Sequence, residues 1–153
     1  MLSLRKWYSC FCVIVIAAAF GCEHENSERQ FFDNPSNDRL NRLRQYDLEE
    51  QYKIFRYGND KIEPPLTELA APIAGRGAEA IPFLLAKLNS ASDDLTIRDI
   101  IQIFQTMASF GFYDVKSDQK LMNQLTFKVS QMNDRAWQKV CIGMLQQIKA
   151  NPS

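Results

Sequence analysis

This chain of 153 residues has a single histidine, His24, which lies close to the N-terminus. Without histidine in the rest of the chain, Ser-His and Cys-His nucleophile pairs and most zinc sites are excluded there. The 18 basic side chains balance the 18 acidic ones, so no basic field attracts nucleic acid. The acidic pairs Glu49-Glu50 and Asp93-Asp94 fit a solvated helix face and a helix start. We therefore expect no catalysis, no metal, no nucleic acid and no small-molecule substrate.

The first 22 residues follow the order of an export signal. Arg5 and Lys6 form a basic start, and residues 7–20 form an uncharged, apolar run. As a helix this run would span about 21 Å, which is less than the roughly 30 Å of a hydrocarbon core. The pattern therefore predicts a cleaved signal rather than a permanent transmembrane helix.

The apolar run ends in AAAFGC, residues 17–22, which resembles the lipobox of bacterial lipoproteins. The resemblance implies cleavage between Gly21 and Cys22 and N-acyl and S-diacylglycerol groups on Cys22, with no other cofactor. Several acyl chains hold a protein stably at a membrane of the cell envelope. Glu23 replaces the aspartate of inner-membrane retention signals, which favours the periplasmic face of the outer membrane in a Gram-negative source. The alternative is an ordinary cleaved signal with a chance cysteine.

The cysteines agree with this interpretation. Cys10 and Cys12 lie in the segment to be removed, and the lipid would occupy Cys22, which leaves only Cys141. No intramolecular disulfide is then expected. Cys141 lies on an apolar helical stripe, so we predict a small core side chain rather than a nucleophile.

The predicted organisation has three parts. Residues 1–21 form the lipoprotein signal peptide, 22–35 a lipidated polar tether and 36–150 a helical domain. Residues 23–30 are polar and have no apolar period, so they are expected to be flexible. From residue 36 onward the apolar spacing is helical, and no alternating strand pattern occurs. Six helices are predicted, over about 37–57, 66–73, 78–88, 94–110, 118–132 and 134–148.

Two of these helices have clear apolar stripes. In the fourth, the inward residues are Ile97, Ile100, Ile101, Ile103, Phe104, Met107, Ala108 and Phe110, and the polar remainder is Arg98, Gln102, Gln105 and Ser109. In the sixth, the inward residues are Trp137, Val140, Cys141, Met144, Leu145 and Ile148.

The segment ELAAPIAGRGAEAIPFLLAKL, residues 68–88, resembles a HEAT-type repeat, and DLTIRDIIQIFQTMASFG, residues 94–111, resembles the first helix of the next one. The resemblance implies an all-α fold, a short HEAT-like superhelix of about six helices; an irregular helical bundle is the alternative. Residues 111–116 form a longer connection than such repeats use. The Gly75-Arg76-Gly77 turn is a weak candidate for anion binding, because a helix-helix turn requires glycine in any case.

Several aromatic side chains do not fit their helix's stripe. Phe83 and Phe127 lie opposite the apolar residues around them, and Tyr46, Tyr52 and Tyr57 spread over more than one face. Two explanations stay open: the helices are covered on two sides, or these residues form a binding surface. On the second, the chain is a membrane-anchored scaffold or assembly factor that binds an envelope protein. The alternatives are an immunity or inhibitor lipoprotein that masks a toxin or envelope enzyme, and a purely structural spacer.

Overall fold

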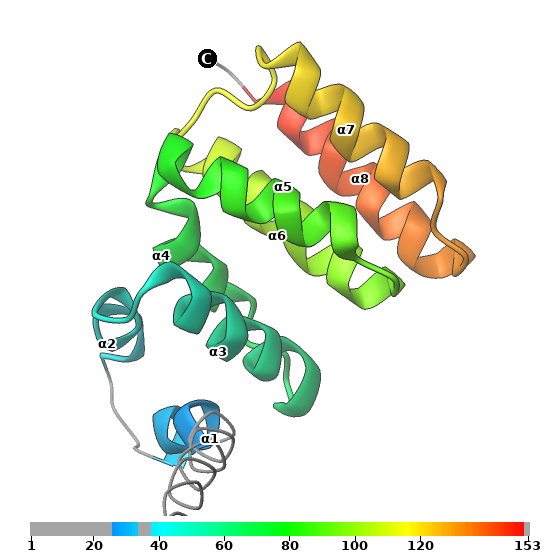
Figure 1. Ribbon diagram of the computed structural model, residues 1–153. Coiled ribbons are helices and arrows are strands. Elements are labelled where there is room, and N and C mark those ends of the chain that lie inside the picture. The colour runs from blue at the N-terminus through cyan, green and yellow to red at the C-terminus, as the bar shows by residue number, and fades with distance from the viewer. Residues whose placement is uncertain (1–25, 34–37, 152–153) are drawn as a thin grey trace, which may run out of the picture. The chain divides into compact units, whose positions relative to one another are not determined.

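The structure is a computed structural model that describes residues 26–33 and 38–151 (Figure 1). Every regular element within these two ranges is a helix, which confirms the all-α class. The predicted cleavage and lipidation residues, Gly21 and Cys22, lie outside the described residues. The chain divides into two compact units, residues 1–34 and 35–153.

In the first unit the structure describes one helix, α1 (Asn26–Asp33). This differs from the flexible segment expected over residues 23–30. Phe31 is buried, and its ring meets that of Phe32 edge-to-face with 5.1 Å between ring centres. Two adjacent aromatic side chains supply the apolar face that residues 23–30 lack by themselves.

The second unit begins with two short helices, α2 (Arg39–Arg44) and α3 (Leu48–Lys61), where the sequence predicted a single helix. Asp47 interrupts it, because its side chain accepts a hydrogen bond from the Glu50 N–H and caps the start of α3. Gln51 Nε2 donates to the carbonyl oxygens of Leu43 and Tyr46, at 3.0 Å each. The Leu43 carbonyl also accepts the Tyr46 N–H at 3.2 Å, and the two Gln51 bonds add partners where the break interrupts the helical pattern.

The remaining helices follow the predicted ones closely. A 3-10 turn (Thr67–Leu69) leads into α4 (Ala70–Ala74), and a second (Gly77–Ala80) leads into α5 (Ile81–Ser90). The three long helices are α6 (Asp94–Ser109), α7 (Gln119–Ser130) and α8 (Arg135–Ala150). Each of these begins at an aspartate, Asp93, Asp118 or Asp134, whose carboxylate accepts backbone N–H groups of the first turn.

Helix α6 is the centre of the second unit. Its most extensive contacts are with α8 and then with α4, and α5 lies beside it as α7 lies beside α8 (Figure 1). Its apolar stripe is buried almost throughout, from Ile97 to Ala108. A regular HEAT-like superhelix remains a prediction.

Three side-chain expectations were wrong. Phe110 is 67% exposed because α6 ends at Ser109 and the next residue turns away from the helical stripe. Val140 is 42% exposed because α8 directs Cys141, Leu145 and Ile148 into the core. Gln102, which was expected on a polar face, is buried.

Over the described ranges, no single helix has the length and apolar content to cross a membrane. The stretches Thr67–Ala74 and Gly77–Ser90, bent by 105° relative to each other, meet that requirement only together.

Candidate functional site

The residues predicted for partner binding have different environments. Tyr52 is only 6% exposed, so its ring belongs to the core, and for this residue the first of the two open explanations, a helix covered on two sides, applies. Phe83 is half-buried and packs edge-to-face on Tyr52, with 5.6 Å between ring centres, and Lys87 Nζ lies 5.1 Å from the Phe83 ring centre. Tyr46 and Tyr57 are half-buried. Phe127 on α7 is 60% exposed. The structure therefore does not bring these residues together on one open surface.

A buried polar cluster joins α3 to α6. The Asp99 carboxylate, 1% exposed, accepts hydrogen bonds from Asn59 Nδ2 at 2.8 Å and from Arg98 Nε at 2.9 Å, and it pairs with Arg56 Nε at 3.0 Å. Gln102 accepts from Asn59 at 3.1 Å. Burial raises the pKa of the Asp99 carboxyl, and the Arg98 guanidinium opposes that shift. We call these five residues the Asp99 cluster, and the hydrogen bonds and the ion pair that link α3 to α6 through them give them a structural role.

A second arrangement lies at the C-terminal end of α6. Phe112 N–H donates to the Met107 carbonyl at 2.9 Å, and Gly111 N–H donates to Ala108 at 3.1 Å. Gly111 has a φ of +68°. This pair of bonds is a Schellman motif, which ends a helix and requires a residue with positive φ. The chain then enters the connection of residues 111–116 that is longer than a HEAT-type repeat uses.

This connection packs against the Gly75-Arg76-Gly77 turn. Gly77 has a φ of +56°, and a Cβ atom there would lie 2.8 Å from the Phe112 carbonyl oxygen. Arg76 donates to Gln51 Oε1 at 3.0 Å and to the Tyr46 carbonyl at 3.1 Å. Close backbone approach and a positive φ thus explain the glycine at position 77, and the hydrogen bonds of Arg76 connect this turn to α3 and to the segment before α3.

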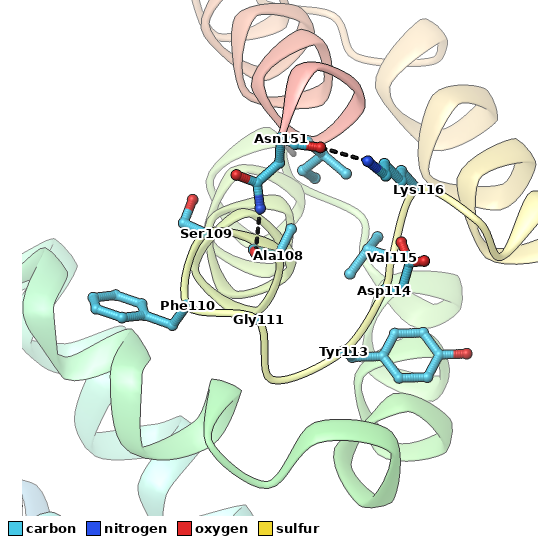
Figure 2. Close-up of a pocket in the computed structure, with 10 residues that line it drawn as sticks. Ala108, Ser109, Phe110, Gly111, Tyr113, Asp114, Val115, Lys116 and Asn151 are labelled. Atoms are coloured by element: carbon cyan, nitrogen blue, oxygen red, sulfur yellow. Dashed lines mark hydrogen bonds between the residues drawn. The ribbon is translucent and has the colours of Figure 1, made fainter. Parts of the chain in front are cut away.

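A cavity of about 490 Å³ opens between this connection and the end of α8 (Figure 2). Asn151, which follows α8, spans it: its side-chain Nδ2 donates to the Ala108 carbonyl, and its own carbonyl accepts from Lys116 Nζ at 2.5 Å. The lining residues are Ala108, Ser109, Phe110, Gly111, Tyr113, Asp114, Val115, Lys116, Ile148 and Asn151. The lining thus combines apolar side chains with one ammonium and one carboxylate group.

Two exposed phenylalanine rings stand beside the cavity. Phe110 and Phe112 are 67% and 44% exposed, and their rings stack with 5.8 Å between centres and an angle of 20° between planes. In Figure 2 the Phe110 side chain extends outward from the loop, away from Lys116 and Asn151. Phe110 is one of the lining residues, so the pair offers apolar contact area next to a cavity of mixed lining.

The far side of the loop is held by Tyr113. Its hydroxyl donates to Asp118 Oδ2 at 2.9 Å, and Asp118 also accepts the Leu121 N–H at 3.0 Å. These bonds lower the pKa of Asp118, the Leu121 bond most of all, and the Asp118 bond raises that of Tyr113. The cap of α7 therefore also anchors the cavity loop.

The sequence did not identify this site, because the helical stripe assigned Phe110 to the core and singled out neither Phe112 nor Lys116. The signal that could have found it is the unusual length of the 111–116 connection, since long loops carry function more often than short ones.

The remaining candidate for chemistry, the thiol of Cys141, has a structural role. Cys141 is buried as predicted, and its desolvation raises the pKa of the thiol to about 11. Within residues 26–33 and 38–151, no group of three or more His, Cys, Asp or Glu side chains could hold a metal ion.

Comparison of the chain with known proteins adds no relative to these observations: no family model, no curated protein and no solved structure matches it.

Proposed function

We propose that this chain is a membrane-anchored lipoprotein of the bacterial envelope that binds another protein, as a scaffold or an assembly factor, and performs no catalysis. The AAAFGC motif with its acyl-accepting Cys22 supports the anchoring. The observation that carries the binding function is the exposed, stacked pair of Phe110 and Phe112 beside the cavity. The proposed partner site is therefore this pair, and not Phe83, Phe127 and the three tyrosines that the sequence suggested.

The physical argument rests on the cost of exposed aromatic rings. Burying a phenylalanine side chain stabilises a folded protein or a complex by about 1.5–3 kcal/mol. Two exposed rings do not provide this stabilisation in the free protein, but they can provide it when a partner covers them. Gly111 and the hydrogen bond from Phe112 N–H to Met107 hold the backbone between them in one conformation. A fixed apolar pair with a polar rim is typical of the centre of a protein interface, where few residues supply most of the binding energy.

The test is in-cell crosslinking of the full chain, expressed in a bacterium that lipidates its own lipoproteins. We expect the double variant Phe110→Ser and Phe112→Ser to lose the protein adducts that the wild type forms. Phe127→Ser is the matched control, because Phe127 is about as exposed as Phe110 but lies on α7. It should retain the adducts.

Two results would contradict the proposal. Adducts that survive the double variant, or that disappear with Phe127→Ser instead, would remove the binding site from the end of α6. Unfolding curves of both variants should match the wild type, since exposed rings contribute little to the core.

A further inference from the structure

Positive charge is concentrated in the last part of the chain. Of the 18 basic and 18 acidic side chains, residues 115–151 contain six basic and only two acidic ones, so this stretch has a net charge of +4 and the remainder of the chain −4. The balanced total of the sequence therefore conceals two oppositely charged parts. Such an asymmetry along a chain is typical of proteins that bind a polyanion or a membrane surface.

The helices α7 and α8 themselves contain no carboxylate; their basic side chains are Lys120, Lys128, Arg135, Lys139 and Lys149. The acidic residues at their starts, Asp118 and Asp134, are caps whose carboxylates accept backbone N–H groups. Asp94 of α6 likewise accepts the N–H groups of residues 133 and 134. Helix α3, by contrast, mixes three acidic with three basic side chains. Because a solvated helix needs no single sign of charge, the composition of α7 and α8 calls for another explanation.

On α8 the charges lie along one exposed line. Spacings of four and three residues separate its members, which places them on one face of the helix, and all are exposed: Arg135, Lys139, Ile142, Gln146 and Lys149. We call these five residues the α8 stripe. At 1.5 Å per residue, the stripe extends about 21 Å along the helix. It thus combines three cations with one apolar side chain, Ile142, which is 44% exposed.

Within residues 38–151, no carboxylate pairs with the cations of the α8 stripe. Arg135 Nη1 donates to a neutral acceptor, Gln138 Oε1, at 2.9 Å. Helix α8 packs mainly on α6 and α7, with α7 beside it as the last helical pair of the second unit (Figure 1), and its buried residues lie on the opposite face from the stripe. The charge of the stripe is therefore available to a ligand.

We propose that the α8 stripe binds the anionic phospholipid headgroups of the membrane to which the chain is anchored, and so orients the helical domain on the bilayer. The inference rests on the anchoring part of the proposed function and adds a second membrane contact to it. Phosphate groups complement a line of ammonium and guanidinium groups, and Ile142 suits the boundary between headgroups and acyl chains. The stripe shares no residue with the Phe110–Phe112 pair, so the two surfaces are separate.

The length of the tether favours a membrane over a second protein as the occupant. Thirteen residues lead from Cys22 to Pro35, where the second unit begins, and even a fully extended chain of that length spans only about 45 Å. An anchored domain stays within this distance of its lipid, where a weak attraction is sufficient because the contact is intramolecular. Each basic side chain near an anionic surface strengthens binding about fivefold, so three cations together supply about a hundredfold.

The experiment uses the full chain, purified from a bacterium that lipidates its own lipoproteins and reconstituted into vesicles whose headgroups carry a nitroxide quencher. A fluorophore on Gln146→Cys reports the stripe, and the same fluorophore on Ala86→Cys reports an exposed position on α5 as the control. Cys141 is buried and does not compete for the label. We expect at least about twofold more quenching at position 146 in vesicles with about 30% phosphatidylglycerol than in phosphatidylcholine alone. Quenching at position 86 should be equal in both.

Salt and charge variants test whether the attraction is electrostatic. Raising the salt from about 0.1 M to about 1 M shortens the screening length from about 10 Å to about 3 Å, which should abolish the difference between the two lipid mixtures. Lys139→Gln with Lys149→Gln should remove most of that difference. The control pair, Lys53→Gln with Lys61→Gln, removes the same charge from α3 and should leave the difference unchanged. Equal quenching at position 146 in both mixtures, or equal losses in the two variant pairs, would overturn the proposal.

The outcomes distinguish this inference from the proposed function. If the mass of the chain shows lipid on Cys22 while phosphatidylglycerol does not change the quenching, the anchor stands and the lipid contact of the stripe is wrong. If Cys22 carries no lipid but the chain binds phosphatidylglycerol vesicles through Lys139 and Lys149, the stripe stands and the anchor is wrong. Protein crosslinks that disappear with the stripe variant, without any dependence on lipid charge, would identify an acidic protein as the occupant and overturn the proposal.

Discussion

Gly77 and Phe112 approach each other so closely that a Cβ atom on Gly77 would lie 2.8 Å from the Phe112 carbonyl oxygen. The obstacle is backbone, which cannot rotate away as a side chain would. This contact joins the turn between α4 and α5 to the loop that borders the cavity, so the position of the candidate site depends on a residue without a side chain.

Gly77→Ala should therefore destabilise the protein by about 1–3 kcal/mol, because alanine must adopt a positive φ and displace the Phe112 backbone. Urea unfolding measures this change. Gly143→Ala is the control: it lies within α8, a Cβ atom there meets nothing within 4 Å, and alanine should stabilise the helix by up to about 1 kcal/mol. Equal effects of the two substitutions would show that the Gly77 contact carries no strain.

Asp99→Ala should destabilise the protein by about 3–5 kcal/mol. The substitution leaves the guanidinium groups of Arg98 and Arg56 beside a buried space without their carboxylate partner. The control is Asp60→Ala, which removes an exposed partner of Lys61 and should change the free energy of unfolding by less than about 0.5 kcal/mol. A loss below about 1 kcal/mol for Asp99→Ala would mean that the cluster is hydrated and weakly coupled.

The cap of α7 should make stability depend on pH in the acidic range. The pKa of Asp118 is lower in the folded protein than in the unfolded chain, chiefly because its carboxylate accepts the Leu121 N–H. A lowered pKa contributes stability at pH values above the unfolded pKa of about 3.9, and that contribution disappears as the pH falls through the folded pKa. The group is largely solvated, so the effect should be modest.

Asp118→Asn retains a capping side chain but removes the titration. The difference in urea midpoint between wild type and variant should stay constant from pH 7 to about 5 and shrink below about pH 4. Parallel pH profiles down to pH 2 would show that Asp118 does not contribute to the acid dependence.

Cys141 should be nearly inert towards alkylation in the native protein. At pH 8 a thiol with a pKa of about 11 has a thiolate fraction of roughly one in a thousand, and burial also blocks access. Peptide mass spectrometry should find Cys141 unlabelled by iodoacetamide in the folded protein and fully labelled in urea. Rapid labelling without denaturant would indicate local opening of α8.

Cys22→Ala tests the lipid anchor. The variant should accumulate as an unprocessed precursor without incorporated fatty acid, because the lipobox cysteine accepts the diacylglycerol before cleavage. The mass of the product shows whether the signal is cleaved, and metabolic labelling with an alkyne fatty acid shows whether lipid is attached. Cys141→Ser is the control and should be processed and lipidated like the wild type. A normally cleaved, lipid-free form of the Cys22→Ala variant would indicate an ordinary signal peptide.

Within residues 38–151, the sequence predicted the helices whose signals come from residues close together in the chain. Apolar residues at helical spacing placed α6 and α8, and Cys141 in the core of α8 followed from the same period. The single helix predicted over 37–57 was wrong because Asp47 caps a new helix within it. Such a break is favourable only when nearby groups bond the carbonyl oxygens that lose their helical partners. Those groups are Gln51 and Arg76, and Arg76 lies 30 residues beyond Tyr46, whose carbonyl it binds.

The sequence by itself thus determined the all-α class, the helix start at Asp93-Asp94 and the burial of Cys141. In each case the interacting groups lie within one or two helical turns. Only the tertiary structure decided the Gly77–Phe112 contact, the Asp99 cluster and the cavity between α6 and α8. These join residues that lie about 35 to 43 positions apart, as in the bonds from Asn59 to Asp99 and from Asn151 to Ala108. Such pairs have no period in the sequence, because they depend on how whole helices pack.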